Sequence, residues 1–313
     1  MTGAELSTGR YVLELLFNSP VSQLWPMLLL PAIAALASDK IARKLPATRA
    51  DWRAAALLTA CPGLVMLAVI AMVAVRSATH MHPDDHLHFL QYHVPFALAV
   101  ALVGRAAWRL YRRNSGVRAL KKLARAASPR LERAAAQVSV PVREIDDDGC
   151  ECFVAGALQP CAYVSRGVLK RMTDEELLAA LHHERAHASS HDPAMLALLT
   201  FLGDLAPGTD RALTLYRQAR ERRADSQAAE RAGPCVLASA LLAVSRGSTA
   251  PAAALGMSGS GPNTWRLQAI LGVEPEVSPM LPGGRLWRAI GLNLALTGWP
   301  VAHMIVVYRV CYP

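Results

Sequence analysis

Residues 183–187 read His-Glu-Arg-Ala-His, a spacing that can support metal-dependent hydrolysis. Residues four apart lie on the same face of a helix, so His183 and His187 can bind one zinc ion together. Glu184 lies beside the first histidine and can remove a proton from a water molecule that the zinc activates. The pattern therefore predicts two zinc ligands, His183 and His187, and a catalytic base, Glu184.

A catalytic zinc site needs a third protein ligand and one position left open for water. The stretch Arg-Glu-Arg-Arg-Ala-Asp at 220–225 provides Glu221 in a second helical segment. Asp225 lies one turn further along the same face and can hold a ligand histidine by its second ring nitrogen. We therefore predict Glu221 as the third ligand and Asp225 as the support of a ligand histidine.

The residues around the first motif predict the helix that its histidines require. Thr173 followed by Glu176 forms a capping box, which marks the start of a helix. Leu177 and Leu181 provide an apolar face, and Pro193 is expected to stop the helix.

These stretches resemble the gluzincin membrane peptidases, which carry H-E-x-x-H, an aspartate shortly after it (here Asp192), and a second helix with E-x-x-A-D. Residues 150–232 are most similar to the BlaR/MecR-type antirepressor peptidases, through FVAGALQP, YVSRGVL and DEELLAALHHERAHASSHDP. The resemblance implies one catalytic Zn²⁺, with Asp192 and Asp225 supporting its ligands.

The resemblance also implies that an edge strand just before the zinc helix pairs with the substrate backbone. Two stretches are open for this role, Phe153 to Leu158 and Ala162 to Ser165. The preferred candidates lie at the start of the first stretch: Phe153, Val154, Ala155 and Gly156.

The composition indicates a membrane protein, since 53% of the 313 residues are hydrophobic and the mean hydropathy is positive. The net charge is +9, but the basic residues lie beside hydrophobic segments. We therefore expect contacts with an anionic lipid bilayer and no direct binding of nucleic acid. The six cysteines lack the spacing of a disulfide framework and are expected to be reduced thiols.

Four hydrophobic segments predict transmembrane helices, at about 18–37, 54–75, 89–108 and 289–308. The loop at 38–53 holds five lysines and arginines, whereas the loop at 77–88 holds none. The positive-inside rule then places the first loop in the cytoplasm and both termini outside.

The expected fold is mainly α and integral to the membrane, with four transmembrane helices and a cytoplasmic α+β zinc peptidase domain of the gluzincin type. Residues 1–110 would hold three of the transmembrane helices, residues 111–285 the peptidase domain, and residues 286–313 the fourth helix and a short tail.

Shorter segments complete this prediction. Residues 138–170 change to the pattern of short strands, and residues 194–206 suit a core or interfacial helix. The basic stretch at 105–133 suits a helix lying on the inner leaflet or, alternatively, a solvated helix. Residues 264–271 resemble the short arginine-containing helix that closes the peptidase domain in the family.

The predicted outer loop is rich in histidine. Its imidazoles could bind a transition metal or titrate near pH 6, and a solvated polar loop is the alternative. The residues concerned are His80, His82, His86 and His88.

The resemblance implies a membrane zinc endopeptidase that cleaves a cytoplasmic protein, such as a repressor or itself, when a signal arrives. The chain ends at Pro313 without the sensor domain that BlaR/MecR-type proteins carry after the fourth span, so we expect the signal to arrive through the outer loop, the membrane or a separate sensor protein as a partner. Two alternatives remain: an HtpX-like or CAAX-type membrane protease of quality control or processing, and a non-catalytic membrane metal sensor or scaffold.

Overall fold

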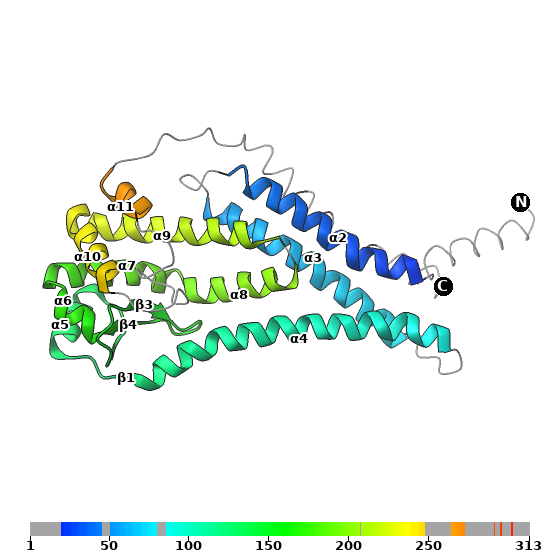
Figure 1. Ribbon diagram of the computed structural model, residues 1–313, viewed down its shortest axis with the longest axis horizontal. Helices are drawn as coiled ribbons and strands as arrows, with labels where there is room; N and C mark the ends of the chain where they lie inside the picture. The colour runs from blue at the N-terminus through cyan, green and yellow to red at the C-terminus, as the bar shows by residue number, and fades with distance from the viewer. Residues whose placement is uncertain are drawn as a thin grey trace, which may run out of the picture.

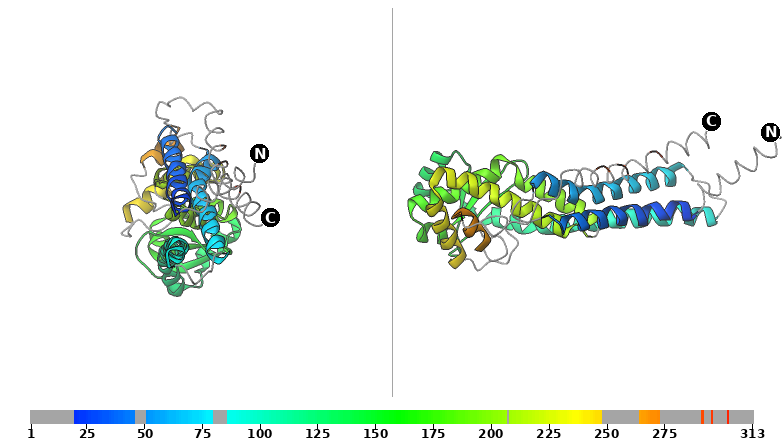
Figure 2. Two further views of the ribbon diagram at one scale, coloured as in Figure 1. Left: turned by 90° about the vertical axis from the view of Figure 1, so that its right-hand side faces the viewer. Right: turned by 90° about the horizontal axis from the view of Figure 1, so that it is seen from above.

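The computed structural model has an elongated shape, with long helices at one end and a small sheet with shorter helices at the other (Figures 1 and 2). It describes residues 20–45, 51–79, 86–206, 208–247 and 264–272, and the single residues 291, 295 and 302.

Three long helices form one end of the molecule: α2 (Pro20–Ala42), α3 (Trp52–Thr79) and α4 (His86–Leu123). In the described part of the chain, one helical segment is long and apolar enough to cross a membrane, Trp52–Val75 in α3. It agrees with the span predicted at 54–75. The spans predicted at 18–37 and 89–108 fall largely on α2 and α4, and the span predicted at 289–308 lies almost wholly outside the described residues.

Helix α4 continues beyond the end predicted for the third hydrophobic segment. It is a single helix of 38 residues, so the basic residues from Arg105 to Lys122 continue the helix that contains residues 89–108. No proline follows Pro95 in α4, so nothing ends the helix near residue 108. Residues 105–122 therefore do not form a helix of their own, and the contact of this basic stretch with the inner leaflet stays a prediction.

A four-stranded sheet occupies the other end, in the order β1-β2-β4-β3. β2 and β4 are parallel, and the outer pairs are antiparallel. The sheet confirms the short strands predicted within 138–170. It also leaves β3 as an edge and places β4 between two neighbours, so the alternative docking strand at 162–165 is wrong. The strands are β1 (Ala124–Arg125), β2 (Val142–Ile145), β3 (Cys152–Ala155) and β4 (Cys161–Ser165).

Helices cover one face of this sheet. Leu177 and Leu181 of α7 pack in one buried cluster with Val154 of β3, Val164 of β4 and Leu241 of α10. This core fixes α7, the helix with the H-E-x-x-H motif, against the edge strand. The helices are α5 (Pro129–Val138), α6 (Arg166–Arg171), α7 (Asp174–Ser189), α8 (Asp192–Leu205), α9 (Asp210–Ala232), α10 (Pro234–Gly247) and α11 (Thr264–Ile270).

Helices α8 and α9 connect the two ends of the molecule (Figure 1). Leu202 and Leu205 of α8 pack with Met66 of α3 and Ala106 of α4, which agrees with the short helix predicted at 194–206. The approach to α3 is close: a Cβ at Gly63 would lie 2.3 Å from the carbonyl oxygen of Leu202. Only glycine permits this packing.

Candidate active site

Helix α7 begins with the predicted capping box. The Thr173 hydroxyl accepts a hydrogen bond from the backbone N–H of Glu176 at 3.2 Å, and the Glu176 carboxylate accepts one from the backbone N–H of Thr173 at 2.9 Å. Both bonds satisfy backbone donors that the first turn leaves free. The helix then carries His183 and Glu184 into the interior, where both are fully buried.

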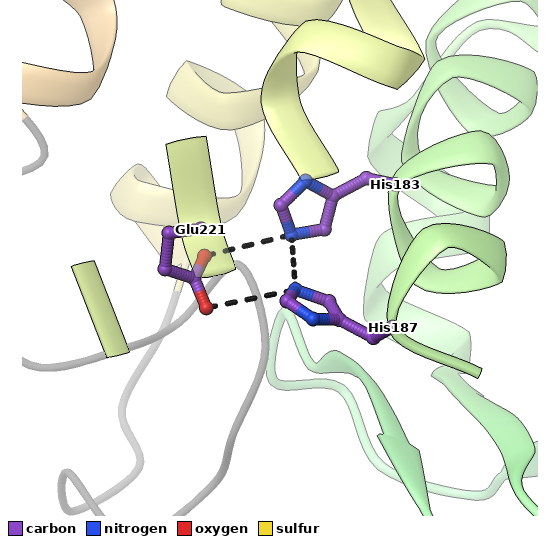
Figure 3. Close-up of side chains that lie close together, drawn as sticks. All are labelled: His183, His187 and Glu221. Carbon is purple, nitrogen blue, oxygen red and sulfur yellow. Dashed lines mark hydrogen bonds and ion pairs between the residues drawn. The ribbon is translucent and has the colours of Figure 1, made fainter. Parts of the chain in front are cut away.

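The structure brings together the three residues that the sequence predicts as metal ligands (Figure 3). The Nε2 atoms of His183 and His187 lie 3.1 Å apart. The carboxylate oxygens of Glu221, from α9, lie 3.5 Å from the first of these nitrogens and 3.6 Å from the second. The three ligand atoms lie within 4.8 Å of one another, so one ion could contact all three.

The chemistry of this cluster fits a zinc ion. Two imidazole nitrogens and one carboxylate form a donor set typical of catalytic zinc sites. Among the described residues, neither carboxylate oxygen of Glu184 has a hydrogen-bond partner. Burial raises the pKa of this carboxyl group. Burying a carboxylate without hydrogen-bond partners costs free energy, and a cation with its coordinated water beside Glu184 would lower that cost.

His183 is held by residues of α9 and α11. Its Nδ1 lies 2.9 Å from a carboxylate oxygen of Asp225, in the place predicted for this aspartate. Arg266 of α11 forms two hydrogen bonds with Asp225, at 2.6 and 2.8 Å, and an ion pair of 3.1 Å with Glu221. Residues 264–271 resemble the closing helix of the family, but the resemblance did not predict that Arg266 reaches the site. A single arginine far along the chain carries no spacing signal.

Electrostatic coupling is strong in this part of the site. Burial alone would raise the pKa of Glu221, but Arg266 and the two histidines lower it to about 2. Burial alone would lower the pKa of His183, but hydrogen bonds with Asp225 and Glu221 raise it to about 9. The pKa of Asp225 falls well below its usual range, since Arg266 outweighs the effect of burial. Both carboxylates are therefore held as anions.

His187 is held by a residue at the start of α8. Its Nδ1 lies 2.7 Å from Asp192, the aspartate that the resemblance implies as a support. A break between α7 and α8 places this aspartate, because His191 adopts a left-handed conformation with φ of 51°. Pro193 lies in the first turn of α8, where proline is tolerated. The expectation that Pro193 stops α7 is therefore wrong, since α7 has already ended at Ser189.

The predicted substrate strand lies against α7, with which β3 makes contacts. Phe153, Val154 and Ala155 are buried, and Phe153 stacks on Tyr163 with ring centroids 5.6 Å apart. Gly156 follows with φ of 112°, a conformation that favours glycine, and begins the turn to β4. One backbone edge of β3 pairs with no described strand. That this edge binds the substrate remains a prediction.

The predicted outer metal site also remains a prediction. His80 and His82 lie outside the described residues, and His86 and His88 lie in the first turn of α4, where the structure describes only the backbone.

Comparison with protein families matches residues 10–247 to the BlaR1 peptidase M56 model. The matched region includes the three long helices, the sheet and both helices that provide the candidate ligands. No curated protein and no solved structure matches the chain. Because the match covers more than half of the sequence, this chain belongs to the BlaR1 peptidase M56 family of membrane peptidases.

Proposed function

We propose that the protein is a zinc-dependent membrane endopeptidase that cleaves a cytoplasmic protein, such as a repressor or itself, in response to a signal. One observation carries this proposal: His183, His187 and Glu221 converge on one point beside the buried, unpartnered carboxylate of Glu184. Membership of a peptidase family supports the same chemistry.

In this mechanism His183, His187 and Glu221 would hold the metal. A bound zinc ion lowers the pKa of a coordinated water and polarises the carbonyl group of the substrate. Glu184 accepts the proton of the attacking water and donates it to the amine nitrogen that leaves. The burial of Glu184 beside the three candidate ligands, with no competing hydrogen-bond partner among the described residues, suits this transfer.

Asp225 and Asp192 position the two imidazoles. Each lies within hydrogen-bond distance of an imidazole Nδ1, and a hydrogen bond accepted from an Nδ1–H there would leave Nε2 free to bind the metal. An aspartate in this role also makes the imidazole a better donor to the metal.

Apolar side chains on the outer faces of α2 and α4 support placing both helices in the lipid bilayer. Leu36 is 70% exposed, and Leu98 and Val100 are 56% and 55% exposed. A row of such side chains is unfavourable in water and suits contact with lipid. We propose four spans with both termini outside and the peptidase in the cytoplasm, because of the unequal distribution of lysine and arginine between the first two loops.

We propose that a separate sensor protein provides the signal and that nucleic acid is not a direct ligand.

The exposed Trp108 and Tyr111 of α4 stack on each other beside Arg109 and Arg112, and aromatic residues of this kind are typical of the interface between membrane and water. This position would place the inner face of the bilayer close to residue 108.

Substitution Glu184→Gln tests the proposal. It removes the proton acceptor while keeping the size of the side chain, and we expect cleavage to fall by about 10²- to 10⁴-fold. The matched control is Glu175→Gln, an exposed glutamate on the same helix. Metal analysis of the purified wild-type protein should give one zinc per chain. Unchanged self-cleavage or substrate cleavage in Glu184→Gln would show that the mechanism is wrong.

The same variant can trap substrates for mass spectrometry. A single captured regulator would support signal-dependent cleavage. A broad set of damaged membrane proteins would favour an HtpX-like quality-control protease, and a wild-type protein without stoichiometric zinc would favour a scaffold.

A further inference from the structure

A continuous row of contacts runs from the beginning of α3 to one of the candidate metal ligands. The Cζ atom of Arg220 lies over the ring of Trp52, 5.1 Å from its centroid. The same guanidinium group forms an ion pair of 2.6 Å with Asp192. Asp192 in turn lies 2.7 Å from Nδ1 of His187. The row therefore joins three helices, α3, α9 and α8, to a residue of α7.

The central pair of this row is buried. Arg220 is 6% exposed and Asp192 is 8% exposed. In such surroundings a charged group requires its partner, because water cannot replace it. The orientation of Asp192, and with it the orientation of the His187 ring, therefore depends on Arg220.

Arg220 directly precedes Glu221 on α9, and successive side chains on a helix point about 100° apart. One turn of α9 thus places the Glu221 carboxylate at the metal position and the Arg220 guanidinium group against Asp192. Asp192 in turn supports a second ligand, His187. A shift of α9 would affect both ligands together.

Trp52 is the first residue of α3, and its position follows that helix. Ala55 and Leu58 of α3 pack in one buried cluster with Leu196 of α8 and Tyr216 of α9. The contact between Trp52 and Arg220 lies at the edge of this cluster, since Trp52 packs against it. The packing keeps the ring of Trp52 over the guanidinium group.

We propose that Arg220 and Trp52 are positioning residues that fix His187 for metal binding, so that the affinity of the site for zinc depends on the position of α3. This inference rests on the proposed zinc peptidase function. It adds that the helix most suited to crossing the membrane is coupled to one of the ligands through Arg220 and Asp192.

The test measures zinc affinity of the full-length protein in lipid nanodiscs, by competition with a chromophoric chelator. We expect Arg220→Met to weaken zinc binding about 10-fold, the lower end of the effect of removing a partner of a metal ligand. Trp52→Leu should weaken it about threefold, because it removes a cation–π contact and leaves the ion pair. Arg220→Lys should lose less zinc affinity than Arg220→Met because it keeps the positive charge. Trp52→Phe should lose less than Trp52→Leu because it keeps an aromatic ring.

Two controls separate positioning from general damage. Arg53→Met removes the other cation that lies over Trp52, at 5.4 Å, and Arg223→Met removes an exposed arginine of α9. Both should bind zinc as the wild type does. Thermal unfolding of the zinc-free variants shows whether each is folded, and the absorption spectrum of the Co²⁺-loaded protein should change in Arg220→Met because the geometry at His187 changes.

A double-mutant cycle gives the sharpest result. If Arg220 acts through Asp192, then Arg220→Met should change zinc affinity by only about twofold in an Asp192→Asn background. A folded Arg220→Met protein with wild-type zinc affinity and an unchanged Co²⁺ spectrum would overturn the inference, and so would full additivity in the cycle. A wild-type protein that binds no zinc would instead overturn the proposed function.

Discussion

The two histidines of the candidate site are supported by the same chemical groups, but from different parts of the molecule. His183 contacts Asp225, which Arg266 of the short helix α11 holds. His187 contacts Asp192, which Arg220 holds beneath the ring of Trp52. The first support lies wholly in the part of the molecule with the sheet. The second reaches the long helices.

The two arginines also differ in what they neutralise. Arg266 contacts two carboxylates, those of Asp225 and Glu221, whereas Arg220 contacts one carboxylate and an aromatic ring. The support of His183 therefore contributes more to the stability of the site, and the support of His187 contributes more to its connection with α3.

Among these variants, Arg266→Met should cause the largest loss of stability. It leaves the buried carboxylate of Asp225 and the partly buried one of Glu221 without their cation, and breaking a buried ion pair in this way costs about 3–5 kcal/mol. Thermal unfolding of the zinc-free protein should show this loss, and added zinc should restore part of it because the metal ion compensates the negative charge. Arg223→Met is the control. A smaller loss than in Arg220→Met would reverse the comparison.

Changes at the two aspartates should have the next largest effect. Asp225→Asn and Asp192→Asn each remove a charged acceptor at an imidazole Nδ1, which typically weakens metal binding about 10- to 100-fold. Because the two aspartates contact different imidazoles, the losses in the double variant should be close to additive. Zinc titration with a competing chelator measures all three variants. A strong departure from additivity would show that the two supports act as one unit.

Gly63→Ala tests the packing of the long helix α3 against α8. The added methyl group would meet the backbone of Leu202, so α8 and α3 would have to separate at a cost of about 1–3 kcal/mol. Thermal unfolding should detect this. Gly104→Ala on α4 is the matched control, since its Cβ would meet nothing within 4 Å, and it should leave stability unchanged or slightly higher. Equal stability of the two variants would contradict the close packing.

The smallest effect is expected at Asp148, an exposed carboxylate that pairs with Arg166 and Lys170. Hydrogen bonds with these two cations lower its pKa to about 2. A lowered pKa stabilises the fold above the pKa of the unfolded chain, and this contribution disappears as the pH falls toward about 2. Asp148→Asn should therefore lower the thermal midpoint only slightly at neutral pH and not at all near pH 2, because solvent weakens exposed pairs. A large loss of stability in Asp148→Asn would contradict the premise that burial makes the ion pairs at the candidate metal site stronger than this exposed pair.

The sequence predicted the parts of the structure that depend on local spacing. The four-residue interval between His183 and His187 and the three-residue interval of the capping box both follow from helix geometry, and both are present. Glu221 and Asp225 could be predicted because they lie one turn apart. The short strands were visible because β-type residues alternate with turn residues.

Contacts between distant residues could not be predicted in the same way. Nothing near Arg266 in the sequence points to Asp225, and nothing near Trp52 points to Arg220, because packing of separate helices creates both contacts. The continuity of α4 was missed for another reason. The change from apolar to basic residues at Arg105 suggested a new element, but polarity changes along a helix without altering the backbone.

That continuity has a mechanical consequence. At 38 residues, α4 is about 57 Å long, and its last residue leads directly into β1. Pairing then passes from β1 through β2 and β4 to β3, the strand that faces α7. A twist of α4 applied at its far end would therefore reach the sheet through β1, and with the sheet α7, which packs against β3 and β4 in the same buried core. The long helices thus connect to the candidate site by two routes, α4 through the sheet and α3 through Trp52 and Arg220.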